Sequence, residues 1–137
     1  MSSVGTVSYM APEILKEDGF NSKVDVFAFG ILMYEVLTGK RAYSEYKDKG
    51  NSFQFMKKVS EGLRPTIKPG MMKKSHQIMI EKCLSGNPND RPTFTELYKK
   101  LSLLQDDLLF EFSLQAEQEV ICYEEENKDE EEENLYQ

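Results

Sequence analysis

The chain has 137 residues, which is enough for one domain, and its net charge of −7 is concentrated near one end. Residues 117–137 hold ten acidic side chains and one Lys, a net charge of −9, whereas residues 1–116 hold 14 acidic and 16 basic side chains, a net charge of +2. The near-neutral part shows no basic stripe, which argues against a nucleic-acid partner. Two Cys and a single His without metal-ligand spacing argue against a zinc site.

The chain begins with a stretch that predicts a loop and then a short helix. Residues 1–10 are small and polar, which favours extended chain or loop. Residues 11–15 (APEIL) predict a short helix, because Pro12 suits a first-turn position and Glu13 lies near the positive end of the helix dipole. No basic stretch followed by an apolar run precedes them, so we expect no secretory signal and a cytoplasmic protein with reduced thiols.

The stretch Val24–Thr38 predicts the central helix, around which the rest of the chain is organised. Its 15 residues are apolar on nearly every side, so we expect the helix to be buried all round. It is too short and too interrupted to cross a membrane, which takes about 20 apolar residues. Asp25 suits the start of this helix, and Gly39 after Thr38 predicts a left-handed cap at its end.

Three further helices are expected after a polar loop over residues 39–52. Apolar residues at helical spacing predict a short amphipathic helix over Ser52–Glu61 and another over about Lys74–Leu84, with Cys83 in the core and His76 exposed to solvent. A last helix starts near Thr93 and carries a leucine stripe that is either core or a partner-binding surface, formed by Leu97, Leu101, Leu104 and Leu108. The pattern shows no alternation of period two, so the expected fold class is mainly α.

The end of the chain differs in character from the rest. Residues 105–116 predict a helical extension of the last helix, and residues 117–137 form a low-complexity acidic segment. Such a segment buries too little apolar area to offset its ordering entropy, so we expect disorder there. The acidic segment is expected to be solubilising, with recruitment of a basic partner as the alternative.

Three segments together resemble the C-terminal lobe of eukaryotic protein kinases. Gly5 to Glu13 (GTVSYMAPE) resembles the end of an activation segment with its Ala-Pro-Glu motif. Residues 25–30 (DVFAFG) resemble the central buried helix of that lobe, and residues 87–94 (NPNDRPTF) resemble the turn into its last helix. Order and spacing also match, so residues 1–104 are identified as part of a protein kinase domain, without the N-terminal β lobe.

The resemblance implies a role for each matching residue. Glu13, with Ala11 and Pro12, would close the activation segment, and Glu13 would form a buried ion pair with Arg91. Asp25 would accept hydrogen bonds from the catalytic loop, and Gly30 would allow close helix packing. Gly5 and Thr6 would belong to the substrate-docking loop. The plainer alternatives remain open: a surface position for Glu13 and Arg91, an ordinary loop position for Thr6, and a helix-start acid for Asp25.

The resemblance also favours one group within the family. Gly5-Thr6 favours Ser/Thr specificity, and residues 53–69, with Glu61-Gly62-Leu63-Arg64-Pro65 among them, resemble the tyrosine-kinase-like group of Ser/Thr kinases. Phe27 departs from the family pattern, which usually has Trp at this position. The smaller aromatic ring is expected to play the same packing role.

The parts of a kinase that bind ATP and perform catalysis are missing from these 137 residues. The sequence contains no Gly-x-Gly-x-x-Gly loop, no Val-Ala-Ile-Lys strand, no His-Arg-Asp and no Asp-Phe-Gly, and phosphoryl transfer needs all of these. We therefore expect ATP and Mg²⁺ to serve only the complete enzyme, and this chain alone to bind no cofactor or metal and to be inactive.

Three interpretations follow from this inventory. The chain is the C-terminal piece of a Ser/Thr kinase, a non-catalytic protein-binding module derived from a truncated kinase lobe, or a decayed paralogue. The expected partners are a protein substrate or a regulatory protein, and no membrane. Without the rest of a kinase, the central helix is expected to leave an apolar patch through which the chain self-associates.

Overall fold

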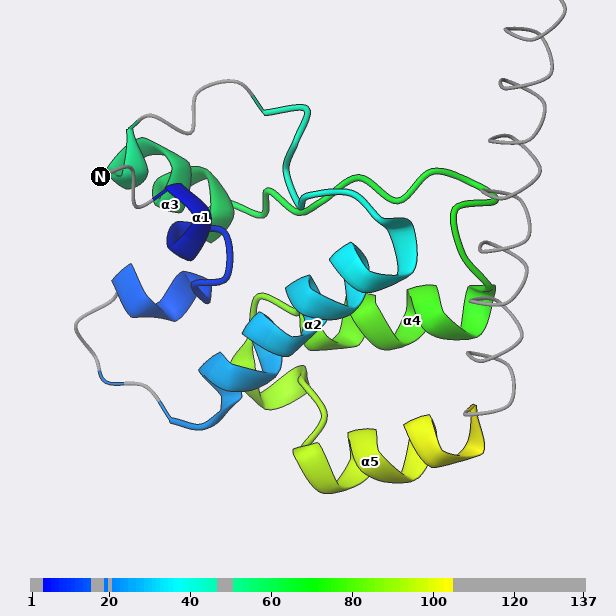
Figure 1. The fold of residues 1–137 in the computed structure, drawn as a ribbon. Coiled ribbons are helices and arrows are strands. Elements are labelled where there is room, and N and C mark those ends of the chain that lie inside the picture. The colour runs from blue at the N-terminus through cyan, green and yellow to red at the C-terminus, as the bar shows by residue number, and fades with distance from the viewer. Residues whose placement is uncertain (1–3, 16–18, 20, 47–50, 105–137) are drawn as a thin grey trace, which may run out of the picture. The chain divides into compact units, whose positions relative to one another are not determined.

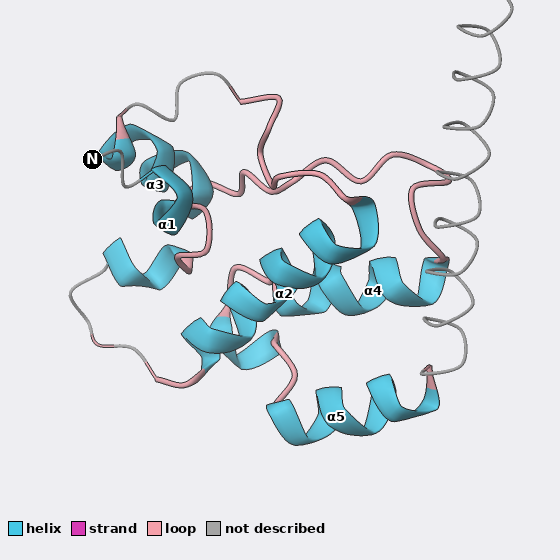
Figure 2. Ribbon diagram, viewed as in Figure 1, coloured by secondary structure: helices cyan, strands magenta, loops and turns pink. Residues whose placement is uncertain are grey.

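The structure is a computed structural model that describes residues 4–15, 19, 21–46 and 51–104. In these residues all regular secondary structure is helical, as Figure 2 shows, which confirms the mainly α fold class. The chain divides into two units, one ending at Phe94 and the other beginning at Thr95. The predicted extension over residues 105–116 and the predicted acidic tail over residues 117–137 lie outside the described residues.

Helix α2 (Lys23–Thr38) is the central element of the first unit and begins one residue before its predicted start. It packs side by side with α4 (Lys74–Cys83), as Figure 1 shows. The predicted left-handed cap is present, because Gly39 has a φ of 64° and its N–H donates to the Glu35 carbonyl at 2.9 Å.

The expectation that α2 is buried all round is wrong for the described residues. Phe27 and Ile31 are fully buried, but Leu32 and Val36 on the other side of the helix keep 47% and 49% of their surface exposed. Large apolar residues lie on both sides, so the difference in exposure arises from what covers each side. No element of the described first unit buries Leu32 and Val36.

Helix α3 (Ser52–Ser60) follows the amphipathic pattern predicted for Ser52–Glu61. Phe55, Met56 and Val59 are buried, and the Asn51 side chain caps the helix by accepting from the Gln54 N–H at 3.2 Å. Helix α3 lies beside the 3₁₀ helix η1 (Pro12–Leu15) and the short helix α1 (Val4–Val7). Segments far apart in sequence therefore form one cluster (Figure 1).

Two local expectations are corrected by the structure. The loop predicted for residues 1–10 contains one helical turn, α1, which is followed by turn residues up to Tyr9. His76, expected at the surface, is fully buried. Its position three, four and seven residues before Met79, Ile80 and Cys83 places it on the buried face of α4, so packing decides its environment.

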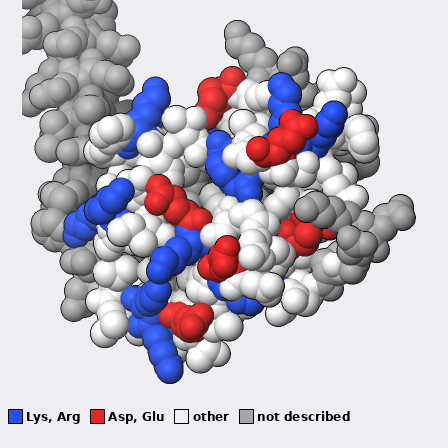
Figure 3. Space-filling view, turned by 180° about the vertical axis from the view of Figure 1, so that it is seen from behind, with Lys and Arg blue, Asp and Glu red and all other residues white. Residues whose placement is uncertain are grey.

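The chain then runs through η2 (Pro88–Asp90) into α5 (Phe94–Leu103). Of the predicted leucine stripe, Leu97 is buried, Leu101 and Leu104 are partly exposed, and Leu108 lies outside the described residues. In the part of the chain that the structure describes, no helix is long and apolar enough to span a membrane. Acidic and basic side chains are interspersed on the face that Figure 3 shows.

Candidate functional site

The centre of the candidate site is an ion pair between Glu13 and Arg91, which are 78 residues apart. The Arg91 Nη1 donates to Glu13 Oε1 at 2.6 Å, and Nη2 donates to Oε2 at 2.8 Å. The Arg91 side chain is 0% exposed and that of Glu13 is 13% exposed. Two parallel bonds between a guanidinium and a carboxylate are the strongest geometry for such a pair. The structure thus joins the residues that the Ala-Pro-Glu and Asn-Pro-Asn-Asp-Arg-Pro segments contribute.

The remaining donors of Arg91 bind backbone carbonyls. Its Nε donates to the Ser85 carbonyl at 2.9 Å, and Nη1 also donates to the Lys23 carbonyl at 2.9 Å. The Lys23 Nζ in turn donates to the Arg91 carbonyl at 2.5 Å. Arg91 therefore ties together η1, the start of α2 and the end of α4, and we call this set of bonds the Arg91 anchor.

Phe27 of α2 lies between two guanidinium groups. The Arg91 and Arg64 Cζ atoms each lie 5.1 Å from the centroid of the Phe27 ring. Arg64 is held by bonds from Nε to the Leu84 carbonyl at 2.7 Å and from Nη1 to the Val59 carbonyl at 2.8 Å. Burial lowers the pKa of the Arg64 guanidinium. The aromatic ring expected to replace Trp thus packs against two cations, the buried Arg91 and the partly buried Arg64.

Gly30 of α2 marks the closest approach between α2 and α4. A Cβ built at Gly30 would lie 2.7 Å from the Cys83 Cβ and 3.0 Å from Leu84 Cδ2. The first of these atoms is bonded directly to the backbone, so it cannot rotate away. The absence of a side chain at position 30 is therefore what lets the two helices pack at this distance.

Sequence reasoning missed a second link, between Tyr9 and Glu35. The Tyr9 hydroxyl donates to Glu35 Oε2, and the Ala42 N–H donates to Glu35 Oε1 at 2.9 Å. The hydrogen bond with Glu35 is the main cause that raises the pKa of Tyr9. Glu35 is the one charged residue between Val26 and Thr38. Because burying an unpaired charge is costly, a carboxylate in so apolar a stretch indicates that it has a hydrogen-bond partner.

The other predicted site residues do not join the anchor through any hydrogen bond in the described residues. Gly5 and Thr6 lie in α1, where Thr6 is exposed and its carbonyl accepts from the Tyr9 N–H at 3.2 Å. Asp25 is exposed in the first turn of α2. Ala11 is fully buried and Pro12 is buried, which fixes η1 next to the anchor.

This arrangement holds a segment in place and carries no reactive group of its own. Arg91 pairs with Glu13, Arg91 and Arg64 also donate to backbone carbonyls, and Phe27 and Gly30 supply packing. Among the described residues, no three His, Cys, Asp or Glu side chains gather where they could hold a metal ion.

Comparison with known proteins identifies the class of protein to which this site belongs. A family model described as protein tyrosine and serine/threonine kinase matches residues 2–101. The chain therefore belongs to the protein kinase family, and its helical fold is that of a fragment of the C-terminal lobe.

Individual relatives are Ser/Thr and dual-specificity kinases. The chain is 35% identical over 103 residues to dual specificity protein kinase shkE of Dictyostelium discoideum, covering 75% of this chain and 14% of the relative. It is 33% identical over 104 residues to serine/threonine-protein kinase VIK of Arabidopsis thaliana, covering 76% of this chain and 23% of the relative. It is 36% identical over 102 residues to the probable serine/threonine-protein kinase roco6 of Dictyostelium discoideum, covering 72% and 5%. The chain thus spans less than a quarter of the length of these relatives.

Proposed function

We propose that residues 1–104 are the C-terminal part of the kinase domain of a cytoplasmic Ser/Thr kinase. In the complete enzyme, this part would fix the end of the activation segment while ATP and Mg²⁺ bind to parts that the 137 residues do not contain. The reaction is transfer of the γ-phosphoryl group of ATP to a Ser or Thr hydroxyl of a protein substrate.

The Arg91 anchor is the observation that carries this proposal. It holds Glu13 in a bidentate ion pair, so the segment Gly5–Glu13 ends at a fixed point on the helical body. The family roles of Glu13 and Arg91 require this contact, and surface positions for them, the plainer reading, do not fit a fully buried Arg91 side chain.

Assignment to the tyrosine-kinase-like group is supported by the stretch around Arg64. The sequence Glu61-Gly62-Leu63-Arg64-Pro65 carries the resemblance, and the Arg64 bonds to Val59 and Leu84 carbonyls give this stretch a defined place against α2. The names of the relatives, which include a dual specificity kinase and Ser/Thr kinases, agree with that group.

A chimera tests the proposal directly. Residues 2–104 of this chain replace the matching segment of the Arabidopsis relative, and transfer of phosphate from Mg-ATP to Ser or Thr of a generic protein substrate is measured. We expect the chimera to be active and the isolated 137-residue chain to be inactive. A second chimera with Arg91→Met is expected to lose activity, because the end of the activation segment is then released.

Matched controls make the outcome decisive. Arg41→Met removes an exposed Arg instead of the buried one and is expected to leave the activity of the chimera unchanged. A chimera that is monomeric and melts cooperatively but transfers no phosphate would contradict the proposal. Turnover of ATP by the isolated chain would contradict the statement that it lacks the catalytic parts.

The second candidate function is a non-catalytic protein-binding module. The half-exposed Leu32 and Val36 on α2 favour it, since an uncovered apolar face is a surface that another protein, or a second copy, can bury. The mass of the native product in its cell of origin separates the two candidates. A product much heavier than 15.8 kDa favours the kinase, and a product of 15.8 kDa favours the module.

A further inference from the structure

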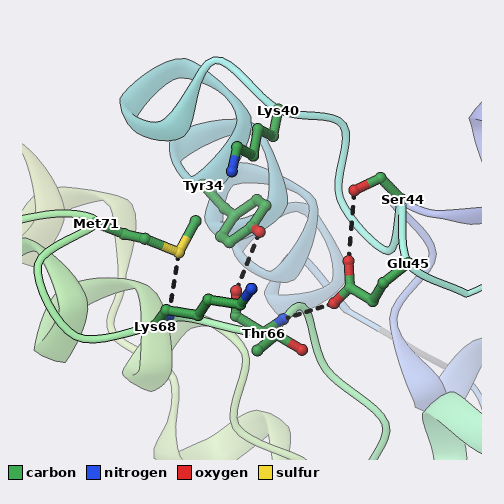
Figure 4. A pocket seen from close by; sticks show the side chains of 7 residues that line it. All are labelled: Tyr34, Lys40, Ser44, Glu45, Thr66, Lys68 and Met71. Atoms are coloured by element: carbon green, nitrogen blue, oxygen red, sulfur yellow. Dashed lines mark hydrogen bonds between the residues drawn. The ribbon is translucent and has the colours of Figure 1, made fainter.

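A pocket of about 320 Å³ lies beyond the C-terminal end of α2, away from the Arg91 anchor. Three segments build it: the last turns of α2, the loop between α2 and α3, and the loop between α3 and α4. Figure 4 shows the side chains that line it, which are Tyr34, Lys40, Ser44, Glu45, Thr66, Lys68 and Met71. The volume is at the small end of the range of ligand sites, about 300–1,000 Å³.

Hydrogen bonds hold the two loops together around the pocket. The buried Tyr34 donates its hydroxyl to the Thr66 carbonyl at 3.1 Å, and the Thr66 N–H donates to Glu45 Oε1 at 3.3 Å. The Lys68 N–H donates to the Met71 sulfur at 3.0 Å. The first two bonds join residues 32 and 21 positions apart and the third lies within one loop, so the wall exists before any ligand arrives.

Tyr43 gives the α2–α3 loop an unusual backbone at the pocket's edge. It has a φ of 59°, a left-handed conformation that a bulky residue rarely adopts, and it is 1% exposed. Its ring packs edge-on against Phe55 with centroids 5.0 Å apart, which holds the loop in this conformation. Ser44 and Glu45 follow directly, so the strained residue sets where they lie.

The charges in the pocket are unbalanced. The hydrogen bond from the Thr66 side chain is the main cause that lowers the pKa of Glu45, and Ser44 Oγ also donates to its carboxylate at 3.4 Å, so this one acid is ionised and engaged. Lys40 and Lys68 extend toward the Tyr34 ring from two different loops (Figure 4). Within the described residues neither ammonium has an ion-pair partner. Two cations and one anion leave a net charge of +1 on the lining.

We propose that this pocket binds a phosphate monoester, held between the Lys40 and Lys68 ammonium groups. A phosphate monoester carries a charge of about −1.5 to −2 at pH 7 and three acceptor oxygens, so it can use two separate point-charge donors at once, which a single carboxylate does less well. The limited volume suits one phosphorylated side chain or a small phosphorylated metabolite better than a nucleotide. The site is separate from the proposed kinase function and does not depend on it.

The experiment titrates the 137-residue chain with phosphoserine, with a short phosphoserine peptide and with the same peptide unphosphorylated. The backbone amide resonances of Ser44, Thr66 and Lys68 report binding by NMR. We expect saturable shifts with both phosphorylated ligands and none with the unphosphorylated peptide. Lys40→Met and Lys68→Met are each expected to weaken binding about fivefold, the upper range for an exposed charge pair.

Two further variants protect the interpretation. Glu45→Gln removes the one negative charge and is expected to strengthen phosphate binding about twofold to fivefold, which a general loss of structure cannot imitate. Lys57→Met removes an exposed Lys from α3, outside the pocket, and is expected to have no effect. Because the 137 residues carry a net charge of −7, general attraction of an anion should be weak.

The outcomes separate the source of the phosphate. Tighter binding of the phosphopeptide than of phosphoserine supports the proposal with a peptide ligand, and equal binding supports it with a small phosphate ester. Absence of saturable shifts overturns the proposal. So does a loss on Lys57→Met equal to that on Lys40→Met, or weaker binding by Glu45→Gln.

Discussion

The two sides of α2 are made of similar residues and have different surroundings. On one side, Phe27 is buried between Arg64 and Arg91, and Gly30 lies directly against α4. On the other side, Leu32 and Val36 are about half exposed, at 47% and 49%. The covered side is the one that holds the Arg91 anchor, so the residues that link distant segments are concentrated there.

This difference shows that hydrophobicity alone does not determine which side of a helix is packed. Burial of an apolar side chain is favourable wherever cover exists, roughly 25 cal/mol per Å², and this term has no direction. Direction comes from residues with specific geometry. Gly30 permits the close approach of α4, and Arg91 places fixed donors toward Glu13 and two backbone carbonyls, those of Ser85 and Lys23.

The largest expected effect is on the covered side, where Arg91→Met removes the anchor. Glu13 then loses its bidentate partner while only 13% of its side chain is exposed, so we expect a loss of about 3–5 kcal/mol in the free energy of unfolding. Such a loss is comparable to the whole stability of a small domain. Urea unfolding followed by circular dichroism should show no cooperative transition for this variant.

The control for that variant is Arg41→Met, which removes an exposed Arg and is expected to change the free energy of unfolding by less than about 0.5 kcal/mol. Equal losses in the free energy of unfolding from Arg91→Met and Arg41→Met would mean that the bidentate pair does not stabilise the fold.

The next largest effect is expected from ionisation of the buried Tyr43 at high pH. Burial raises the pKa of Tyr43 to about 12, from an ordinary value of 10.0. The neutral phenol is favoured in the folded chain, so its contribution is complete below pH 10 and is lost as the pH rises through about 12. Two pKa units correspond to about 2–3 kcal/mol at most. Urea unfolding at pH 9 and pH 12 should therefore show a smaller loss for Tyr43→Phe than for the natural chain.

Tyr98→Phe is the matched control for that comparison, because Tyr98 is a largely exposed phenol. It should lose the same stability between pH 9 and pH 12 as the natural chain. A loss for Tyr43→Phe as large as that of the natural chain would show that the Tyr43 phenol is not the group responsible.

Much of the fold on both sides of α2 could be predicted from the sequence. The sequence pattern placed α2, α3 and α4 to within one residue at each end, because α2 is a long apolar run that ends at Gly39 and because α3 and α4 carry apolar residues at helical spacing. Helix α1 was missed, since four residues have little helical stability of their own and depend on their surroundings. His76 was placed at the surface because of its polar side chain, although its position on the apolar face of α4 indicated burial.

The site was predictable only in part, and for a different reason. The contact between Glu13 and Arg91 came from resemblance to a family and not from any spacing, because no local pattern relates residues 78 positions apart. The bond between Tyr9 and Glu35 spans 26 positions and was missed for the same reason. The exposure of Leu32 and Val36 could not be predicted from the sequence of α2, since it depends on which other elements pack against that side of the helix.

A smaller effect on the covered side is expected from Gly30→Ala. The new Cβ would lie 2.7 Å from the Cys83 Cβ, so α2 and α4 must separate, at a cost of about 1–3 kcal/mol. The gain in helix propensity, about 1 kcal/mol, offsets part of this cost. We expect a net loss of up to about 2 kcal/mol by urea unfolding. Cys83→Ala in the same chain should not relieve it, because the contact is with Cβ; relief would point to the sulfur instead.

The smallest effect on stability and a large effect on association are expected on the side of α2 that carries the half-exposed Leu32 and Val36, which we call the open side. Leu32→Gln with Val36→Gln replaces two half-exposed apolar side chains, so the free energy of unfolding should change by no more than about 0.5 kcal/mol. If the open side is a surface through which chains associate, the double variant should be monomeric at concentrations where the natural chain is not. Sedimentation velocity of both chains measures this, with Phe53→Gln, an exposed apolar residue on α3, as the control.

A natural chain that is monomeric throughout would show that this apolar face alone does not drive association. A marked loss of stability in the double variant would instead show that Leu32 and Val36 are covered in solution, and that the contrast between the two sides of α2 is smaller than the structure indicates.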